Sequence, residues 1–328
     1  MLSTRDFEVL DASLASVADD DARLVKVADT DAHEGPVYAL DEDALYFTTV
    51  PRVGRSTDAS PEVAVKRLAL DGDRCPLDPA RHGAVGEAVV RASANVSNGM
   101  TLGRDGRLVV CEQGTRTSAA RIVALDRATG CVEPLVTGWD DRPLNSPNDV
   151  VVRRDGTIWF TDPSYGHLQG FKAPPALGDH VYCHDPGTHE TSVVAEDFDK
   201  PNGLAFSPCG SVLYVGDSGA NHEPGTYDPT RPHHVVAFDV TPTGSLAGCR
   251  CFAVIDPGFP DGIKVDAQGR VYVSAFDGVH VFDPEGRLLG KIRLPGAVNF
   301  AFGGVDRNIL FITADSAVFA AVLTTQGA

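Results

Sequence analysis

The chain has 328 residues, 43% of them hydrophobic, and its 45 Asp and Glu against 28 Lys and Arg give a net charge of −17. This length and apolar content exclude wholesale disorder, and the acidic balance disfavours a nucleic-acid partner, which requires a basic surface. The 33 Gly and 22 Pro, against only 2 Met, favour many short strands joined by tight turns.

The first residues lack the basic segment and the apolar segment of a secretory signal. No apolar run approaches the roughly 18 residues that a membrane helix requires. The seven cysteines are scattered and form no Cys-x-x-Cys pair, which argues against a zinc site or a disulfide framework. We therefore expect a cytoplasmic protein with free thiols that binds neither nucleic acid nor membrane.

Residues 1–20 are predicted to form an N-terminal extension with a short surface helix, and residues 21–328 a single domain. One unit recurs within this domain: a polar anchor residue, a strand, a Gly eight residues after the anchor in the clear copies, and a second strand. The anchors are Glu34, Asn98, Asn148, Asn202, Asp261 and Asn299. Most intervals between them are 50 to 64 residues, enough for four strands each. The sequence therefore predicts an all-β fold, a six-bladed β-propeller of four-stranded antiparallel blades.

The ring must also close. The last unit contains only three strands, the third at 317–323, whereas the apolar segment 23–28 precedes the first anchor. We expect this N-terminal strand to become the outer strand of the sixth blade, because that pairing closes the ring and covers an edge. Residues 52–60, 71–88 and 219–231 are expected to be polar loops, the last of them at the rim of one face.

The anchors point to a cation site. The innermost strand of each blade lines the channel of a propeller, so residues at the starts of these strands meet at one mouth. Six carboxylate or carboxamide side chains are expensive to bury unless something satisfies them. Oxygen donors of these two kinds are what Ca²⁺ or Mg²⁺ binds. The alternative is that Asn-Gly and Asn-Asp are merely turn residues at strand starts.

A second ring of acids follows from the hairpin geometry. Glu112, Asp162 and Asp217 lie fourteen or fifteen residues after their anchors, where the second strand returns to the same mouth. They are candidates for orienting the ligands or for binding substrate hydroxyls, or else they are exposed strand-end residues. Tyr165 and His167, in the loop after Asp162, are further candidates for substrate binding.

Several segments resemble the gluconolactonase/regucalcin (senescence marker protein) family, whose relatives include diisopropyl fluorophosphatase. The resemblance extends over all six blades and is strongest for the bacterial gluconolactonase branch. It rests on Glu34-Gly-Pro, Cys111-Glu112-Gln-Gly, the run from Ser146 to Gly166, Pro201-Asn202-Gly and Pro260-Asp261-Gly. The resemblance implies one divalent cation at the channel mouth, held by Glu34, Asn148, Asn202 and Asp261.

The same resemblance leaves Asn98 and Asn299 outside the ligand set, as candidates for contact with substrate or water. The chain also departs from the animal members of the family. Ser146 stands where those members have an Arg that grips the sugar acid, and Gly166 stands where they have a Glu. The identity of the substrate is therefore not carried over.

The resulting hypothesis is a metal-dependent lactonase that acts on a sugar-acid lactone or a similar small lactone. The cation, most simply Ca²⁺ but alternatively Zn²⁺, Mg²⁺ or Mn²⁺, would polarise the ring carbonyl. Asp261, both ligand and base, would take a proton from the attacking water. One alternative is other chemistry at the same metal, such as phosphotriester hydrolysis, hydration or isomerisation in a biosynthetic pathway. Another is a non-enzymatic calcium-binding propeller.

Overall fold

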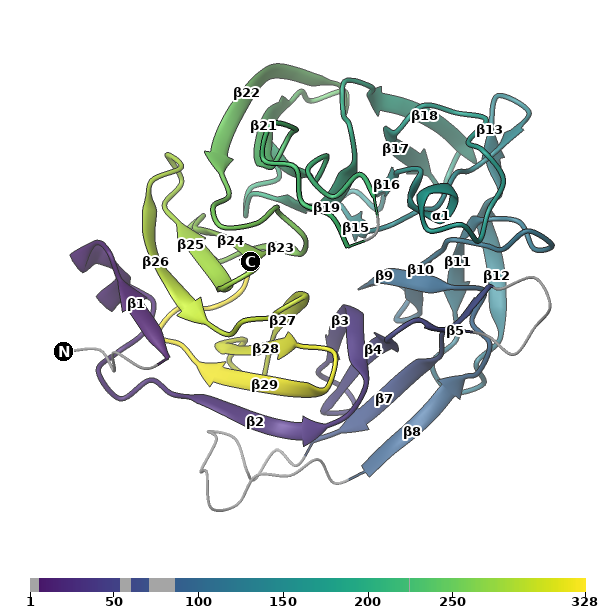
Figure 1. Cartoon of the computed structure of the whole chain (residues 1–328). Helices are drawn as coiled ribbons and strands as arrows, with labels where there is room; N and C mark the ends of the chain where they lie inside the picture. Colours follow the sequence, from purple (N-terminus) through teal and green to yellow (C-terminus); the bar gives the residue numbers. More distant parts are fainter. Residues whose placement is uncertain (1–5, 54–59, 71–85, 224) are drawn as a thin grey trace.

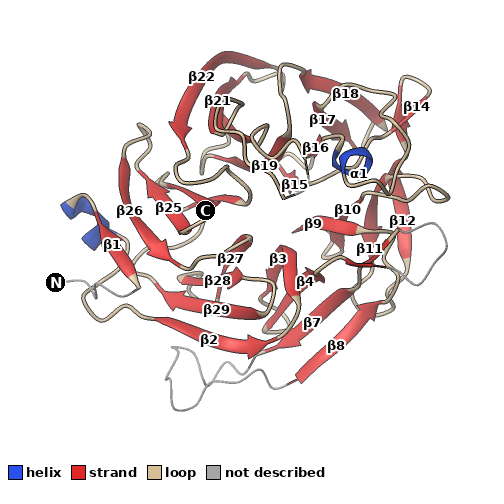
Figure 2. Cartoon of the chain, in the orientation of Figure 1, coloured by secondary structure: helices blue, strands red, loops and turns tan. Residues whose placement is uncertain are grey.

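The computed structural model describes residues 6–53, 60–70, 86–223 and 225–328. The regular secondary structure of these residues is almost entirely strand, and six antiparallel sheets are arranged in a ring (Figure 1). The predicted six-bladed β-propeller is thereby confirmed. Figure 2 shows how little helix the ring contains: one turn of α-helix, α1 (Tyr165–Leu168), and one 3₁₀-helix (Ala12–Ser16) among the described residues.

The first three blades follow one another along the chain, each with its innermost strand first. Blade one comprises β3 (Ala32–Ala39), β4 (Ala44–Thr49), β7 (Val65–Ala69) and β8 (Gly86–Arg91). Blade two comprises β9 (Ser97–Leu102), β10 (Leu108–Glu112), β11 (Arg121–Leu125) and β12 (Val132–Val136). Blade three comprises β15 (Val150–Val152), β16 (Ile158–Asp162), β17 (His180–Asp185) and β18 (Glu190–Ala195).

Blades four and five continue this order. Blade four comprises β19 (Pro201–Phe206), β20 (Val212–Asp217), β21 (His234–Val240) and β22 (Leu246–Val254). Blade five comprises β23 (Ile263–Val265), β24 (Val271–Ala275), β25 (Gly278–Phe282) and β26 (Leu288–Arg293). Two small hairpins lie outside the blades, namely β5 (Arg52–Val53) with β6 (Pro61–Glu62) and β13 (Gly138–Trp139) with β14 (Arg142–Pro143).

Blade six joins the two ends of the chain. It comprises β27 (Asn299–Gly303), β28 (Ile309–Thr313), β29 (Ala317–Val322) and the N-terminal β2 (Leu24–Asp29). β2 pairs antiparallel with β29, with Lys26 opposite Phe319. The prediction that an N-terminal strand completes the sixth blade is confirmed, and the outer edge of β29 is covered by a strand almost 300 residues earlier in the chain.

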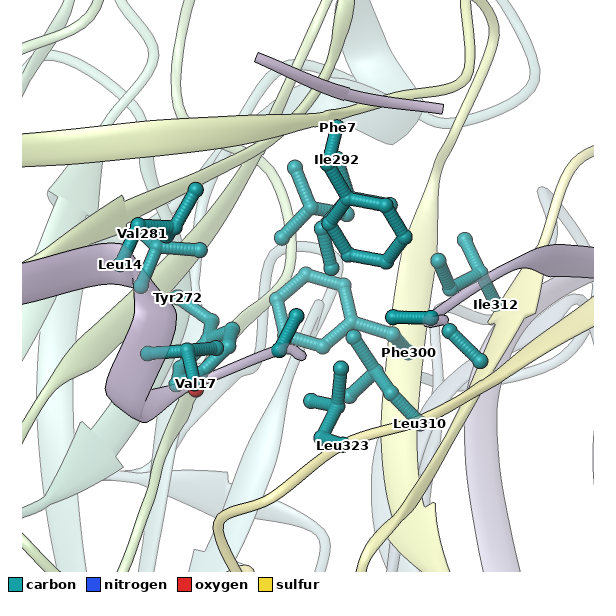
Figure 3. Close-up of a cluster of buried hydrophobic side chains, with 14 of the residues drawn as sticks. Phe7, Leu14, Val17, Tyr272, Val281, Ile292, Phe300, Leu310, Ile312 and Leu323 are labelled. Atoms are coloured by element: carbon teal, nitrogen blue, oxygen red, sulfur yellow. The ribbon is translucent and has the colours of Figure 1, made fainter. Parts of the chain in front are cut away.

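The segment before β2 is also attached to the ring. β1 (Phe7–Val9) pairs with β26, which makes blade five a five-stranded sheet rather than the four-stranded sheet that was expected. The 3₁₀-helix follows, capped by Asp11, whose side chain accepts from the Ser13 backbone N–H at 2.8 Å. Figure 3 shows Phe7, Leu14 and Val17 packed into the apolar cluster between blades five and six. Residues 1–5 lie outside the described residues.

The hydrophobic core is itself a ring. Within the described residues, each pair of neighbouring blades shares an apolar cluster, from blades one and two round to blades six and one. The second strand of a blade contributes to the clusters on both of its sides, so β4, β10, β16 and β28 are buried along their whole length. This arrangement leaves the innermost strands free to carry polar groups around the axis.

Three surface segments were expected to be polar loops. Residues 54–59 and 71–85, which cover most of the first two expected loops, lie outside the described residues, as does residue 224 in the third. Residues 86–88 were assigned to the second loop, but they begin β8 instead. In the described part of the chain, no helix has the length and apolar character needed to cross a membrane.

Candidate metal centre

The six anchors lie at the same end of the six innermost strands. Four are inside a strand near its start: Glu34 in β3, Asn98 in β9, Asn202 in β19 and Asn299 in β27. Asn148 and Asp261 lie two residues before β15 and β23. Neighbouring innermost strands adjoin around the ring, including β27 with β3, which closes it. The predicted convergence of the anchors at one mouth therefore agrees with the topology.

The glycine that follows an anchor has a packing role. The backbone N–H of Gly99 donates to the Asn148 carbonyl at 2.7 Å, and that of Gly203 donates to the Asp261 carbonyl at 3.1 Å. A Cβ atom on Gly99 would lie 2.5 Å from the Asn148 oxygen, and one on Gly203 would lie 2.0 Å from the Asp261 oxygen. The Asn-Gly pairs are thus inside strands that touch the next blade, and the turn interpretation is wrong for them.

The acidic anchors interact with their neighbours. Asn299 Nδ2 donates to Glu34 Oε2 at 2.8 Å, and the Glu34 side chain is only 5% exposed. Burial, together with the negative charge of Glu34, raises the pKa of Asp261 well above its usual range, although a hydrogen bond with Asn202 opposes the rise. Two carboxylates and an amide are therefore gathered at one place, and the two negative charges oppose each other there.

The donor set fits a hard divalent cation. Carboxylate and amide oxygens are the preferred ligands of Ca²⁺ and Mg²⁺, and a dication would offset the repulsion between Glu34 and Asp261. Within the described ranges, no group of three or more His, Cys, Asp or Glu side chains could hold a metal. The proposed site is not a group of this kind, because two of its four ligands are the amides of Asn148 and Asn202. It is also unsuited to a thiolate-bound zinc.

Two further oxygens lie near this place without a protein partner. Asn98 Oδ1 and Asp149 Oδ2 are buried, and neither has a hydrogen-bond partner in the described structure. Asp149 directly follows Asn148 and was not predicted from the sequence. Burial raises its pKa to about 6, the positive charge of Lys264 opposes the rise, and the negative charge of Glu34 adds to it.

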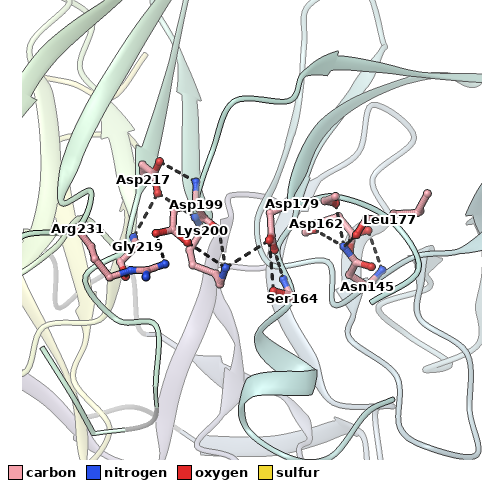
Figure 4. Close-up of polar contacts among 11 residues, drawn as sticks. Asn145, Asp162, Ser164, Leu177, Asp179, Asp199, Lys200, Asp217, Gly219 and Arg231 are labelled. Atoms are coloured by element: carbon pink, nitrogen blue, oxygen red, sulfur yellow. Dashed lines mark hydrogen bonds and ion pairs between the residues drawn. The ribbon is translucent and has the colours of Figure 1, made fainter. Parts of the chain in front are cut away.

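The acids of the second ring hold the backbone that leads to the ligands. Asp162 accepts from the backbone N–H groups of Asn145 and Ser146 at 2.8 and 2.7 Å, just before Asn148. Burial raises the pKa of Asp162 to about 7, against the effect of these two hydrogen bonds. Figure 4 shows Asp162 directed at this segment.

Blade four repeats the arrangement of blade three. Asp217 accepts from the backbone N–H groups of Asp199 and Lys200 at 3.0 and 2.9 Å, and these residues precede Asn202 by three and two positions (Figure 4). The Lys200 ammonium lies 3.3 Å from Asp179 and 3.2 Å from Asp199, which connects neighbouring mouth loops. Of the two roles considered for these acids, their contacts favour orienting the ligands.

Glu112 differs from the two aspartates. It is fully buried and forms ion pairs with Arg91 and Arg121 at 2.9 and 2.6 Å, and it accepts from Asn95 Nδ2 at 2.8 Å. Its carboxylate is therefore occupied by protein groups, and it ties together the segment just before Asn98.

The two substrate-binding candidates in the loop after Asp162 lie in different surroundings. Tyr165, in α1, is 5% exposed, and its pKa is raised by burial and by the negative charge of Asp261, with Asn202 and Ser218 also beside it. The structure thus brings Tyr165 to the anchors. His167 is exposed, and its side chain has no hydrogen bond or ion pair within the described residues. It is not brought to the same place.

Hydroxyl groups that were not predicted from the sequence join neighbouring blades. Thr161 Oγ1 of blade three donates to the Asn202 carbonyl of blade four at 2.8 Å, and Thr313 Oγ1 of blade six donates to the His33 carbonyl of blade one at 2.6 Å. Ser274 Oγ donates likewise to the Val298 carbonyl at 2.6 Å. A Thr or Ser thirteen or fourteen residues after an anchor was the signal available for these contacts.

A family model and several named relatives match this chain. The family model of the SMP-30/gluconolactonase/LRE-like region matches residues 32–316. A gluconolactonase of Zymomonas mobilis is 28% identical over 279 residues, which cover 82% of this chain and 71% of the relative. A lactonohydrolase of Aspergillus oryzae is 28% identical over 300 residues, and the match spans 85% of this chain but only 65% of the relative.

The solved structures include a gluconolactonase from Xanthomonas campestris. It is 33% identical in sequence, with a TM-score of 0.78, and the match covers 98% of this chain and 96% of that one. The family model thus covers most of the propeller, from the start of blade one to the end of β28, the second strand of blade six. This chain belongs to the SMP-30/gluconolactonase/LRE-like family.

Proposed function

We propose that this protein is a lactonase that opens a sugar-acid lactone or a similar small lactone with the help of one divalent cation. Family membership and the named gluconolactonase and lactonohydrolase relatives support the activity. The cation is supported by one observation above all. The Glu34 and Asp261 carboxylates lie together at the buried mouth of the channel, where their negative charges oppose each other. Asn148 and Asn202 complete the proposed ligand set.

A cation bound at this site supplies Lewis acidity toward the lactone carbonyl and stabilises the negative charge that develops on its oxygen. Asp261 accepts a proton from the attacking water. The water oxygen adds to the carbonyl carbon, the ring C–O bond breaks, and the ring oxygen takes up a proton to give the hydroxy acid. A cation beside Asp261 would lower the pKa of this carboxyl, and it would also acidify the attacking water, so that Asp261 could take the proton.

Substrate contacts are proposed for the polar groups that the fold leaves unoccupied. Asn98 carries a buried oxygen without a protein partner, and Tyr165 lies beside Asp261. Glu112, Asp162 and Asp217 are engaged by protein groups, so we propose that they orient the site rather than bind hydroxyls of the substrate. Asn299, bonded to Glu34, is proposed to hold that ligand.

We propose Ca²⁺ as the ion, because the four ligands offer only carboxylate and amide oxygens. Zn²⁺, Mg²⁺ and Mn²⁺ remain alternatives to be compared directly. We also propose a cytoplasmic location: all six cysteines within the described residues are free thiols, as a reducing compartment allows. The seventh, Cys75, lies outside the described residues. The acidic surface disfavours nucleic acid as a partner.

A pH-stat screen tests the proposal, because ring opening of a lactone releases an acid. The purified protein is assayed against aldonolactones, simple alkyl lactones and a phosphotriester, before and after exhaustive treatment with EDTA. We expect hydrolysis of at least one lactone, its loss on chelation and its return with Ca²⁺. Activity that persists without metal overturns the metal mechanism, and phosphotriester turnover without lactone turnover overturns the substrate class. Binding of Ca²⁺ without any turnover supports the non-enzymatic alternative instead.

A further inference from the structure

The segment before the amide ligand of blade three is held at both ends of its peptide groups. Asp162 accepts from the backbone N–H groups of Asn145 and Ser146 at 2.8 and 2.7 Å. Lys172 Nζ donates to the Asn145 carbonyl and, at 3.4 Å, to the Leu144 carbonyl. These N–H and carbonyl groups belong to two consecutive trans peptide groups, in which they point in opposite directions. The segment therefore lies between a carboxylate and an ammonium group.

Blade four holds the equivalent peptide group in the same way. Asp217 accepts from the backbone N–H of Lys200 at 2.9 Å, and Lys200 Nζ donates to the Asp199 carbonyl at 2.6 Å (Figure 4). That peptide group begins three residues before Asn202, which is its position relative to the amide ligand of blade three as well. The two lysines come from different positions in their blades, so the repeat of the sequence does not by itself explain why both contacts exist.

Lys172 also connects this segment to two other parts of the mouth. Its Nζ donates to the Gln113 carbonyl of blade two at 2.7 Å, and its backbone N–H donates to the Gly166 carbonyl at 2.9 Å. The Gly166 N–H in turn donates to Ser146 Oγ at 2.8 Å. A Cβ atom on Gly166 would lie 2.7 Å from Lys172 Cδ, so the lysine stem packs directly against this turn. The turn carries Tyr165, the residue proposed to contact the substrate.

We propose that Lys172 is a positioning residue of the site. Its ammonium group, together with Asp162, fixes the segment that presents Asn148, and its stem seats the turn that presents Tyr165. This inference rests on the proposed function, in which Asn148 binds the cation and Tyr165 contacts the lactone. Hydrogen-bond donation and charge make opposite predictions for Lys172. Loss of a positive charge favours the binding of a cation, whereas loss of the hydrogen bonds loosens a ligand and weakens it.

Titration calorimetry with Ca²⁺ tests the direction of the effect. Lys172→Met keeps most of the stem and removes the ammonium group, so it should weaken the dissociation constant by about tenfold. At saturating Ca²⁺ its KM for the lactone should stay close to that of the wild type. Lys172→Ala also removes the stem that supports the turn of Tyr165, so its KM should rise as well. A dissociation constant that is unchanged or tighter in Lys172→Met overturns the proposal.

Chemical rescue separates hydrogen-bond donation from charge. Lys172 lines a cavity of about 280 Å³ together with Leu144 and Asn145, so a small amine can reach the space that Lys172→Ala leaves. Ethylammonium should restore most of the Ca²⁺ affinity of this variant, because it has N–H donors for the free carbonyl groups. Tetramethylammonium at the same ionic strength carries the charge without a donor and should restore none. Equal recovery with both ions, or recovery with neither, overturns the proposal.

Lys291→Met is the matched control for the calorimetry. Lys291 is a buried lysine of blade five, and its ammonium pairs with Asp277 at 2.8 Å, away from the segment before Asn148. Its replacement removes a lysine ammonium group of similar burial and should leave the dissociation constant for Ca²⁺ unchanged. A change as large as that of Lys172→Met would attribute the effect to a general loss of charge or stability, and the proposal would fail.

Hydrogen exchange in EDTA separates this inference from the proposed function. Lys172→Met should speed the exchange of backbone amides in residues 145–149 by about tenfold or more, because the segment opens more often. Residues 198–202, which Lys200 holds, should exchange as in the wild type. If the wild type binds no divalent cation or opens no lactone, the proposed function fails, while this measurement still decides whether Lys172 holds the segment. Unchanged exchange in residues 145–149, or an equal increase in residues 198–202, overturns the positioning role.

Discussion

The carboxylate of Asp162 accepts a 2.7 Å hydrogen bond from the backbone N–H of Ser146, two residues before Asn148. Asp217 holds the backbone N–H of Lys200 in the same way, two residues before Asn202. The second strand of a blade therefore fixes the backbone from which its own first strand presents an amide ligand. This repeated contact gives the acids at the strand ends a physical role without any contact to substrate.

Asp162→Asn tests that role. The amide cannot accept from both Asn145 and Ser146 as the carboxylate does, so the segment before Asn148 should loosen. Loss of such an orienting contact typically costs 10-fold to 100-fold in metal affinity, and we expect a loss of about that size for Ca²⁺ by calorimetry. Asp155→Asn, at an exposed hairpin turn of the same blade, is the control and should leave affinity unchanged. Equal affinities for the Asp162 variant and the wild type would contradict the orienting role.

Asp261→Asn tests the charge repulsion at the site and the need for this carboxylate in turnover. Because burial and Glu34 both raise the pKa of this carboxyl, replacing it by a neutral amide removes a charge repulsion. We expect the metal-free variant to melt at or above the temperature of the wild type in EDTA, while kcat for lactone opening falls by about 10²-fold or more. Retention of full kcat would remove Asp261 as the base, and a lower melting temperature in EDTA would contradict the repulsion.

The dependence of stability on pH provides a test of Asp149. Its folded-state pKa of about 6 lies above that of an unfolded aspartate, so its contribution favours folding at low pH. That contribution is fully present below about pH 4 and is lost as the pH rises through about 6, amounting to roughly 2–3 kcal/mol. In EDTA, the melting temperature of Asp149→Asn relative to the wild type should therefore rise between pH 4 and pH 7. A difference that stays constant over this range would show that Asp149 does not titrate there.

The sequence was sufficient to predict the ring and its closure. The spacing of the anchors predicted six units, and the apolar segment before Glu34 predicted the pairing of β2 with β29. Both predictions rest on local patterns that a propeller repeats. β1 was not predicted, since Phe7 to Val9 is too short to show a period and its partner β26 lies about 280 residues away. Only the apolar surface between blades five and six explains why it binds there.

The candidate site could be predicted only in part. The anchors were found because each stands at the same position of a repeat, and Asp149 escaped notice because a repeat comparison treats it as the equivalent of a glycine. Lys264 lies inside β23, where a strand pattern assigns a direction but not a partner. Its contact with Asn299 depends on blades five and six meeting at the axis, which no single segment reveals.

Gly203→Ala tests whether the close approach of the innermost strands sets the geometry of the site. The added Cβ atom would lie 2.0 Å from the carbonyl oxygen of Asp261, which is backbone and cannot move without shifting that ligand. We expect a fall in melting temperature of about 10 °C or more, or failure to fold, because a clash in a packed interior costs several kcal/mol.

Gly86→Ala is the matched control, since no atom lies within 4 Å of its added Cβ. It should change stability by no more than about 1 kcal/mol. Gly203→Ser would add the same clash with a hydroxyl group, so it should resemble the alanine variant. A Gly203→Ala protein with the stability and Ca²⁺ affinity of the wild type would show that the innermost strands can move apart, and that the ligand positions do not depend on their contact.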